Sequence, residues 1–476
     1  MLCNYNLSQI RTIECNTAVI GGGLAGSCAA ISSARGGAKT VLIEAGGTLG
    51  GQAGQGLVTP LSSYRSAKGE DFGGLVTEII TDVSALTKKY VCSESEHGKV
   101  YTISPHMTKY ALLKAAHNSG VDVHFHTVLC DAEIDEGSVT SAIFRDKSGF
   151  LRISAKTFVD ATGDADLVYL CGDDYVLGSE EGVFDSLYEA NLATAHGDGE
   201  KCEEYSHSGL MQPVSLFFVM RGVDYEKASS LNNKTIRFGD LGIARERFEK
   251  WEFAGTPGFE PVSDHVPMPQ DRVLVTRGRH SDEAVVNMSR VININGADAE
   301  DLSKGETAAQ LQVIAIVDFL KTFIPGFEKS YLVETSSRLG VRESRRLVGK
   351  YVLSGRDVIT GRHFDDAVCR AFYMIDIHDP TGKHRAIGGD IESDFFEIPF
   401  GSLCSKKFSN LLVCGRCISC DHVSHSAARI QGACILTGQA AGCAAAISSG
   451  SNTSVCEIPT DVLRSELKKC GVNLGK

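Results

Sequence analysis

The chain has 476 residues, a length that predicts two or three domains, or one large core with insertions. With 43% hydrophobic and 22% charged residues and 50 glycines that follow no period, the composition is that of a globular protein, which excludes a collagen-like or low-complexity chain. The formal net charge of -12 argues against a general nucleic-acid binder, because a broad basic face would require strong local clustering.

Features that would direct the chain out of the cytoplasm are not evident. The first residues show no basic segment leading into an apolar core, so we expect no signal peptide. We find no stretch of about 18 apolar residues, so we expect no membrane span. The sixteen cysteines are then expected to be reduced thiols, most of them small buried side chains of a cytoplasmic protein.

The first elements in chain order predict a β-α-β unit. A strand is expected over residues 17–20, a helix rich in Ala and Ser over 27–35, and a second apolar strand over 40–43. A pair of glycines closes the helix. The two strands should be parallel and joined by a right-handed crossover.

Shorter elements follow. Residues 64–105 are polar and mixed, and we expect them to leave the sheet. Helical spacing returns over 107–117. Strands are then predicted over residues 121–129, 132–135, 139–144 and 158–163.

The middle of the chain has a different sequence pattern. It contains β-like runs over 214–220, 284–294 and 372–378, and a long amphipathic helix over 307–323. Near the end, a strand over 410–415 runs into glycine, and a helix of small residues covers 433–448. We therefore predict one α/β domain interrupted by another, with a first part over 1–170, an inserted domain over 171–400, a second part over 401–450 and a tail over 451–476.

Three glycines follow the first strand, at Gly21, Gly23 and Gly26. The first allows a tight turn, the second lets backbone N–H groups approach a pyrophosphate, and the third lets the helix pack close to the strand. Glu44 ends the second strand, where an acidic residue should bind a ribose hydroxyl. The pattern predicts dinucleotide binding, and the alternative is a glycine-rich turn without a ligand.

The continuation of the sequence separates FAD from NAD. Residues 46–53 carry a glycine pair, 159–164 end a strand in Ala-Thr-Gly, 410–418 contain Cys-Gly-Arg, and 437–442 resemble the start of a helix. In this order they resemble FAD-dependent oxidoreductases with a glutathione-reductase-like FAD fold, related to fumarate-reductase-type and tRNA-flavin-modifying proteins. The resemblance covers nearly the whole chain. It implies a Rossmann-like α/β FAD-binding domain with a parallel sheet, interrupted by a mixed α/β substrate domain.

The resemblance also implies which residues hold FAD. Gly415 and Arg416 should approach the ribityl chain, although the family usually has an acidic residue in place of Arg416. Residues 437–442 should begin the last helix, with its first amides facing the N1/C2 edge of the flavin. The full predicted set of cofactor-binding residues is Gly21, Gly23, Ala25, Gly26, Glu44, Gly50, Gly51, Leu129, Thr162, Gly163, Gly415, Arg416, Gly438 and Gln439.

Two histidines are candidates for catalysis. His378 ends a run that resembles the strand before the flavin site in the family, so it is a predicted general acid or base. The alternative is that His378 has no catalytic role and caps the turn before Asp379. His422 also matches a family position, and its alternative is an ordinary loop histidine.

Arginines supply the other candidates. Residues 340–346 resemble the Arg-rich signature of the family. On a helix, Arg342, Arg345 and Arg346 would share one face and bind an anionic substrate or the pyrophosphate. The alternative is a solvated charged face, and Arg429 is open to the same two interpretations.

Other redox chemistry is not predicted. Cys414, Cys417 and Cys420 have a spacing seen in iron–sulfur proteins, but Cys414 lies in the strand expected against the flavin. No Cys-x4-Cys pair follows the first motif, and no His/Cys/Asp cluster has zinc-like spacing, so we expect no catalytic disulfide and no metal.

We therefore predict an FAD-dependent oxidoreductase that transfers a hydride at flavin N5 to or from a small organic substrate. No second glycine triplet follows a strand, so electrons would come from the substrate, an electron-donor protein or transiently bound NAD(P)H. The alternatives are a tRNA-modifying flavoprotein, which the acidic charge disfavours, and a non-catalytic electron-carrier subunit. We expect no nucleic-acid or membrane partner, and the sequence leaves the oligomeric state open.

Overall fold

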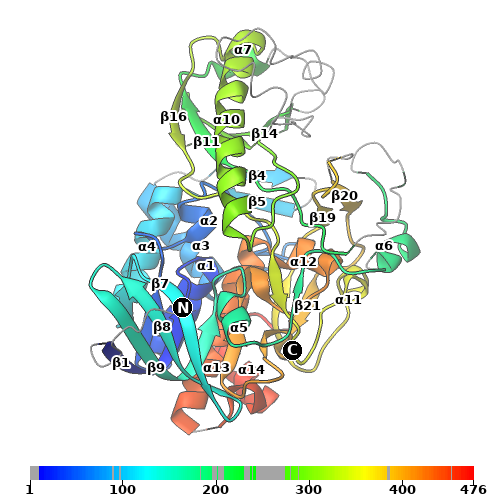
Figure 1. The fold of residues 1–476 in the computed structure, drawn as a ribbon. Coiled ribbons are helices and arrows are strands. Elements are labelled where there is room, and N and C mark those ends of the chain that lie inside the picture. The colour runs from blue at the N-terminus through cyan, green and yellow to red at the C-terminus, as the bar shows by residue number, and fades with distance from the viewer. Residues whose placement is uncertain are drawn as a thin grey trace.

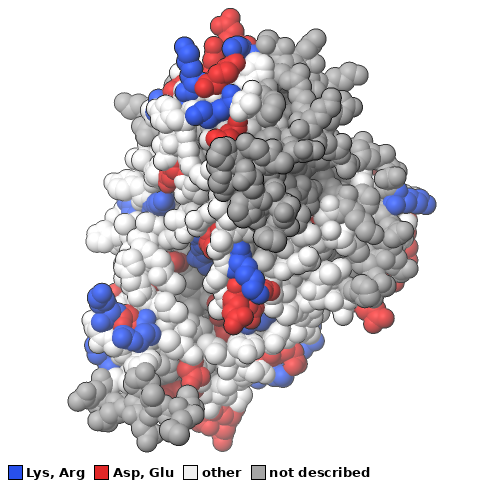
Figure 2. All heavy atoms as spheres, turned by 45° about the horizontal axis from the view of Figure 1, so that its top comes forward, with Lys and Arg blue, Asp and Glu red and all other residues white. Residues whose placement is uncertain are grey.

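A computed structural model describes most of the chain (Figure 1). The described residues are 10–87, 91–95, 98–182, 184–195, 201, 208–229, 236–237, 240–242, 274–278, 280–287, 289–382, 386–451 and 453–475. In this part of the chain, the structure has a larger α/β body and a smaller sheet. The smaller sheet and the long helix beside it, α10, lie above the larger body in the view of Figure 1. On the face shown in Figure 2, basic and acidic side chains are interspersed.

The larger body is built on parallel strands. β1 (Arg11–Ile20) pairs in parallel with β2 (Thr40–Ile43) and β9 (Gly149–Asp160). β6 (Asp122–His124) extends the sheet beyond β2, and β22 (Leu411–Val413) pairs with the last residues of β9. The first half of β9 instead pairs antiparallel with β8 (Ser138–Asp146), which pairs with β7 (Val128–Asp135). The predicted parallel α/β fold class is confirmed.

The two ends of the chain meet where α1 (Leu24–Arg35) packs on α13 (Gln431–Ser451). A Cβ added to Gly438 or Gly442 would lie 2.1 Å from the carbonyl oxygen of Ala25 or Ala29, so only glycine allows this approach. By length and composition alone α13 could cross a membrane, so our expectation that no such stretch exists is wrong. However, 83% of its most apolar window is buried inside the fold, as in the core helix of a soluble protein.

The smaller sheet is antiparallel and has its own core. Its strand order is β12 (Ile236–Arg237), β13 (Asp240–Gly242), β14 (Leu274–Arg277), β15 (Ala284–Asn287), β11 (Phe217–Arg221) and β16 (Tyr331–Thr335). α10 (Ala299–Phe323) contributes Val313, Ile316 and Phe319 to that core. The helix begins earlier than predicted because the Asp298 side chain accepts hydrogen bonds from the first amides of the helix.

The remaining elements complete the larger body or connect the two parts. They are α2 (Gly51–Gly54), β3 (Pro60–Leu61), α3 (Gly74–Thr87), β4 (Val91–Ser95), β5 (Gly98–Thr102), α4 (Pro105–Asn118), α5 (Asp166–Leu170), β10 (Tyr175–Leu177), α6 (Asp185–Glu189), α7 (Tyr225–Ser229), β17 (Arg345–Leu347), α11 (Gly355–Thr360), β18 (Ala367–Ala371), β19 (Ile375–Ile377), β20 (Ile387–Gly389), β21 (Phe396–Pro399), α12 (His422–Ala428) and α14 (Thr460–Lys469). The predicted domain boundaries remain a prediction.

Three local expectations differ from the structure. The segment expected to be polar contains α3, which buries Val76, Ile79 and Ile80 in the main core. The strand expected over 121–129 is interrupted at His126, whose φ of 53° is left-handed. The predicted tail contains α14, whose Leu463 and Leu467 are buried.

Candidate functional site

A cavity of about 1140 Å3 lies at the carboxyl ends of β1, β2, β9 and β22, and it reaches Phe217 and Asn287 of the smaller sheet. This edge is where open α/β sheets bind ligands. Pockets for single drug-sized ligands measure roughly 300–1,000 Å3. The cavity is therefore slightly larger than the usual pocket for one drug-sized ligand.

The glycine loop after β1 forms one wall of the cavity. Gly21 has a φ of 104°, and a Cβ at Gly26 would lie 1.8 Å from the Gly21 carbonyl oxygen, so both positions require glycine. A Cβ at Gly23 would meet nothing within 4 Å, so the loop is open toward the cavity there. α1 has neither a side-chain N-cap nor an acidic residue in its first turn, and Ala25 lines the cavity. The positive end of the helix therefore suits a phosphate.

Glu44 stands at the end of β2 and lines the cavity. Its carboxylate accepts hydrogen bonds from the backbone N–H groups of Gly22, at 2.7 Å, and Gly46, at 2.6 Å. These bonds connect the acidic residue to the glycine loop. Gly50 and Gly51 also line the cavity, and both have left-handed φ values.

The loop after β9 is organised by Asp160, a residue that our sequence analysis did not single out. This buried carboxylate accepts hydrogen bonds from Thr162 Oγ1, at 2.7 Å, and from the N–H groups of Leu167 and Val168. Burial raises the pKa of Asp160, and these hydrogen bonds oppose that shift. The loop presents Thr162 and Gly163 to the cavity, and Leu129 of β7 lines it too.

The loop after β22 brings Gly415 and Arg416 to the cavity. Gly415 has a φ of 77°, and an added Cβ would lie 2.7 Å from the Ala25 side chain. Arg416 Nη2 lies 2.8 Å from Asp164 Oδ1, and Nη1 donates to Ser344 Oγ at 3.0 Å. Its charge is therefore matched by a neighbouring carboxylate.

Gly438 and Gln439 do not have the predicted position. α13 begins at Gln431, so Gly438 lies inside the helix rather than at its first amides. Neither residue lines the cavity, and neither does Gly26. Gly438 serves the contact with α1, and Gln439 Oε1 accepts a hydrogen bond from the N–H of Leu75. The contact with α1 therefore constrains Gly438, and the hydrogen bond with Leu75 holds the Gln439 side chain.

The Arg-rich segment is extended and not helical, so its arginines do not share a face. Arg342 lines the cavity and Nη1 donates to the carbonyl oxygen of Pro213 at 2.6 Å. Arg345, in β17, pairs with Asp166, and both residues also line the cavity. Arg346 is fully buried. The three arginine side chains of this segment therefore have three different sets of partners.

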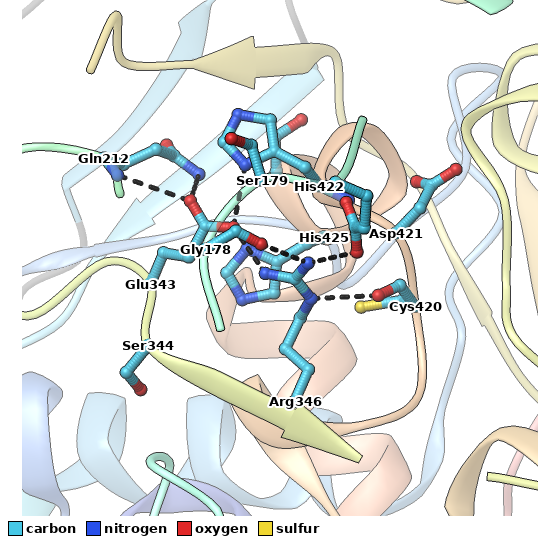
Figure 3. Close-up of polar contacts among 12 residues, drawn as sticks. Gly178, Ser179, Gln212, Glu343, Ser344, Arg346, Cys420, Asp421, His422 and His425 are labelled. Atoms are coloured by element: carbon cyan, nitrogen blue, oxygen red, sulfur yellow. Dashed lines mark hydrogen bonds and ion pairs between the residues drawn. The ribbon is translucent and has the colours of Figure 1, made fainter. Parts of the chain in front are cut away.

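Arg346 belongs to a buried network of charges (Figure 3). Its guanidinium donates to Glu343 and to Glu180, and Glu343 Oε1 lies 2.7 Å from Nδ1 of His422. Burial raises the pKa of Glu343, but its contacts with His422 and Arg346 outweigh burial and hold that pKa well below its usual range. His422 is completely buried and does not line the cavity. The structure thus places His422 in this network and not on the wall of the cavity.

His378 does line the cavity, and both of its ring nitrogens have partners. Nδ1 lies 2.6 Å from Arg290 Nη2, and Nε2 lies 3.4 Å from Asp376 Oδ2. A guanidinium can only donate, so Nδ1 accepts and the proton is on Nε2. Burial and the charge of Arg342 lower the pKa of His378 to about 3. The ring is therefore neutral near pH 7.

Arg429 completes this end of the cavity. Its Nη2 donates to Gln212 Oε1 at 3.3 Å, and the same oxygen accepts the N–H of His378 at 3.1 Å. Gln212 in turn donates its N–H to Glu343 Oε2, so the buried network supports the cavity wall (Figure 3). Sequence analysis did not select Gln212, Arg290 or Asp376, because no local motif marks them.

The depressed pKa of His378 predicts acid sensitivity. The folded state favours the neutral ring, so its contribution to stability is present above the unfolded pKa of about 6.5 and is lost as the pH falls toward 3. At a fixed FAD concentration, the free energy of unfolding should fall by up to about 1.4 kcal/mol per pH unit from this group. Urea unfolding of His378→Asn should show a shallower fall than wild type. The exposed variant His117→Asn should follow wild type, and parallel profiles for all three proteins would contradict this assignment.

Within the described residues, no group of three or more His, Cys, Asp or Glu side chains is arranged to hold a metal ion. Cys414, Cys417 and Cys420 are buried, free thiols there. Burial raises the pKa of each of them.

The parallel sheet, the glycine loop and the cavity define a dinucleotide-binding enzyme of the α/β class. The family model described as FAD dependent oxidoreductase matches residues 17–467, so the chain belongs to this family and binds FAD. No curated protein matches the sequence.

Two solved structures are similar to this chain at low identity. A geranylgeranyl bacteriochlorophyll reductase-like protein from Thermoplasma acidophilum is 14% identical over 97% of this chain and 85% of its own, with a TM-score of 0.45. A p-nitrophenol 4-monooxygenase from Pseudomonas putida is 9% identical over 96% of this chain and 84% of its own, with a TM-score of 0.47. Similarity at this level gives no information about the substrate of this chain.

Proposed function

We propose that this flavoenzyme transfers a hydride between flavin N5 and a small organic substrate that lies beside His378, Arg342 and Arg429. The supporting observation is the single cavity that joins the glycine loop to these three side chains. When bound, FAD supplies the two-electron chemistry. The protein supplies binding, orientation and electrostatics.

The residues of the chain divide these tasks. The amides at the start of α1 would hold the pyrophosphate, and Glu44 would bind the ribose. His378 orients its neighbours, because it accepts from Arg290 and donates to Asp376. In the proposed acid–base role it would have to release one of these two bonds.

We also propose that this chain is related to the glutathione-reductase-like and fumarate-reductase-type flavoproteins. The Ala-Thr-Gly turn after β9 lies beside the glycine loop after β1, since a Cβ at Gly21 would touch Ala161. The electron source is proposed to be the substrate, an electron-donor protein or NAD(P)H.

Anaerobic stopped-flow spectroscopy tests the proposal. Small organic acids, sugars and nicotinamides are mixed with the FAD-loaded enzyme, and bleaching of the flavin band identifies the reductant. His378→Ala should keep the flavin and slow the reaction by about tenfold or more, because its neighbours lose their orientation. His363→Ala, at an exposed position, serves as the control. Reduction by a protein partner alone would favour an electron carrier, and an unchanged rate in His378→Ala would remove that residue from the mechanism.

A further inference from the structure

Three arginines from distant parts of the chain meet at one end of the cavity. Arg290 follows β15, Arg342 lies between β16 and β17, and Arg429 ends α12. Burial and the charges of the other two arginines lower the pKa of Arg342 to about 9. Arg342 therefore remains charged at neutral pH, although like charges surround it.

Negative charge is scarce at this end. Elsewhere in the cavity, Arg416 is paired with Asp164 and Arg345 with Asp166. At the arginine end, the carboxylate among the described cavity-lining residues is Asp376, whose Oδ2 lies 4.0 Å from Arg429 Nη2.

Arg342 has no ion pair with any described carboxylate. Its hydrogen-bond partner in this part of the chain is the carbonyl oxygen of Pro213. The Nε–H group of Arg429 is buried and has no hydrogen-bond partner among the described residues. A partly buried cation without a carboxylate partner and an unpaired donor both cost free energy, and a ligand that brings negative charge and acceptor atoms reduces both costs.

Hydrogen bonds position the backbone of Arg290 and the side chain of Arg429. Arg290 donates its backbone N–H to Gln312 Oε1 at 2.7 Å, and its carbonyl oxygen accepts from Gln312 Nε2 at 2.8 Å. Arg429 is held by Gln212 and by the carbonyl oxygen of Asp376. Fixed guanidinium groups suit an oxyanion, which can accept two parallel hydrogen bonds from each fork.

We propose that the substrate of this enzyme carries an oxyanion group, a carboxylate or a phosphate, which binds to Arg342 and Arg429 beside Arg290. This proposal depends on the proposed function, because it places the substrate in the same cavity as the flavin. Tyr373, Met374 and Phe217 also line the cavity, and they would contact the apolar part of the molecule.

Calorimetric titration of the FAD-loaded enzyme tests the proposal without turnover. Benzoate, phenyl phosphate and the neutral benzamide are compared, so that the two oxyanions are distinguished from each other and from an uncharged molecule of similar shape. We expect one of the anions to bind at least about tenfold more tightly than benzamide, because charge-assisted hydrogen bonds are stronger than neutral ones.

Arg342→Gln should weaken binding of that anion by about 10- to 100-fold and leave benzamide and FAD binding unchanged. Arg356→Gln, on the exposed surface of α11, is the control. Equal affinity for benzamide and both anions, binding of neither anion, or an unchanged anion affinity in Arg342→Gln would overturn the proposal. Loss of FAD from Arg342→Gln would also overturn it, because the arginine would then serve the cofactor. Anion binding without any flavin reduction would instead count against the proposed function alone.

Discussion

Gly23→Val is expected to abolish FAD binding while the protein remains folded. Gly23 has φ −64° and ψ −176°, a backbone conformation that any residue adopts, and a Cβ there meets nothing within 4 Å. The valine side chain would instead fill the space through which a phosphate approaches the start of α1. We expect the affinity for FAD to fall by at least about 100-fold. The measurement is a fluorescence titration with FAD, together with the flavin absorbance of the purified protein.

The control is Gly450→Val, an exposed position where a Cβ also meets nothing within 4 Å. This variant should bind FAD as wild type does. Without FAD, both variants should melt within a few degrees of wild-type apoprotein. Stoichiometric FAD in Gly23→Val would show that the pyrophosphate does not lie on this loop.

The second large effect is expected from Glu343→Ala, which should lower the free energy of unfolding by about 3–5 kcal/mol. Both Glu343 and Arg346 have completely buried side chains, and His422 Nδ1 also contacts this carboxylate. Removing the carboxylate leaves part of the Arg346 charge uncompensated in the core. Urea unfolding at pH 7 measures the change.

The matched control is Glu78→Ala, which breaks the surface pair with Arg35, where the two side chains are 38% and 43% exposed. Such pairs contribute about 0–1 kcal/mol. If Glu343→Ala destabilises the protein no more than Glu78→Ala does, the network has no role in stability.

The dinucleotide loop could be predicted from sequence because its requirements are local. Gly21 requires glycine for its left-handed φ, Gly26 contacts the Gly21 carbonyl oxygen, and Glu44 accepts the N–H of Gly22, so these requirements lie within one β-α-β unit. The same reasoning failed at Gly438. Its glycine is required by a helix more than 400 residues earlier in the chain, and no local pattern distinguishes such packing from a helix start.

The end of the cavity formed by Arg290, Arg342 and Arg429 was harder to predict, because residues distant in sequence form it. Arg342 and Arg346 were expected on one helical face, but contacts with distant residues, including Glu180, hold the segment extended. Arg290 has no sequence motif at all, and only the fold brings it to His378. The helical spacing of α3, in contrast, was present in the sequence at Val76, Ile79 and Ile80 and was missed because charged and polar residues surround it.

A crystal structure of the FAD-loaded enzyme would test the central claim most directly. We expect the pyrophosphate within hydrogen-bond distance of the amides at the start of α1, and the flavin ring between that loop and Arg342. Density for FAD outside this cavity, or a flavin ring that points away from the three arginines, would contradict the account.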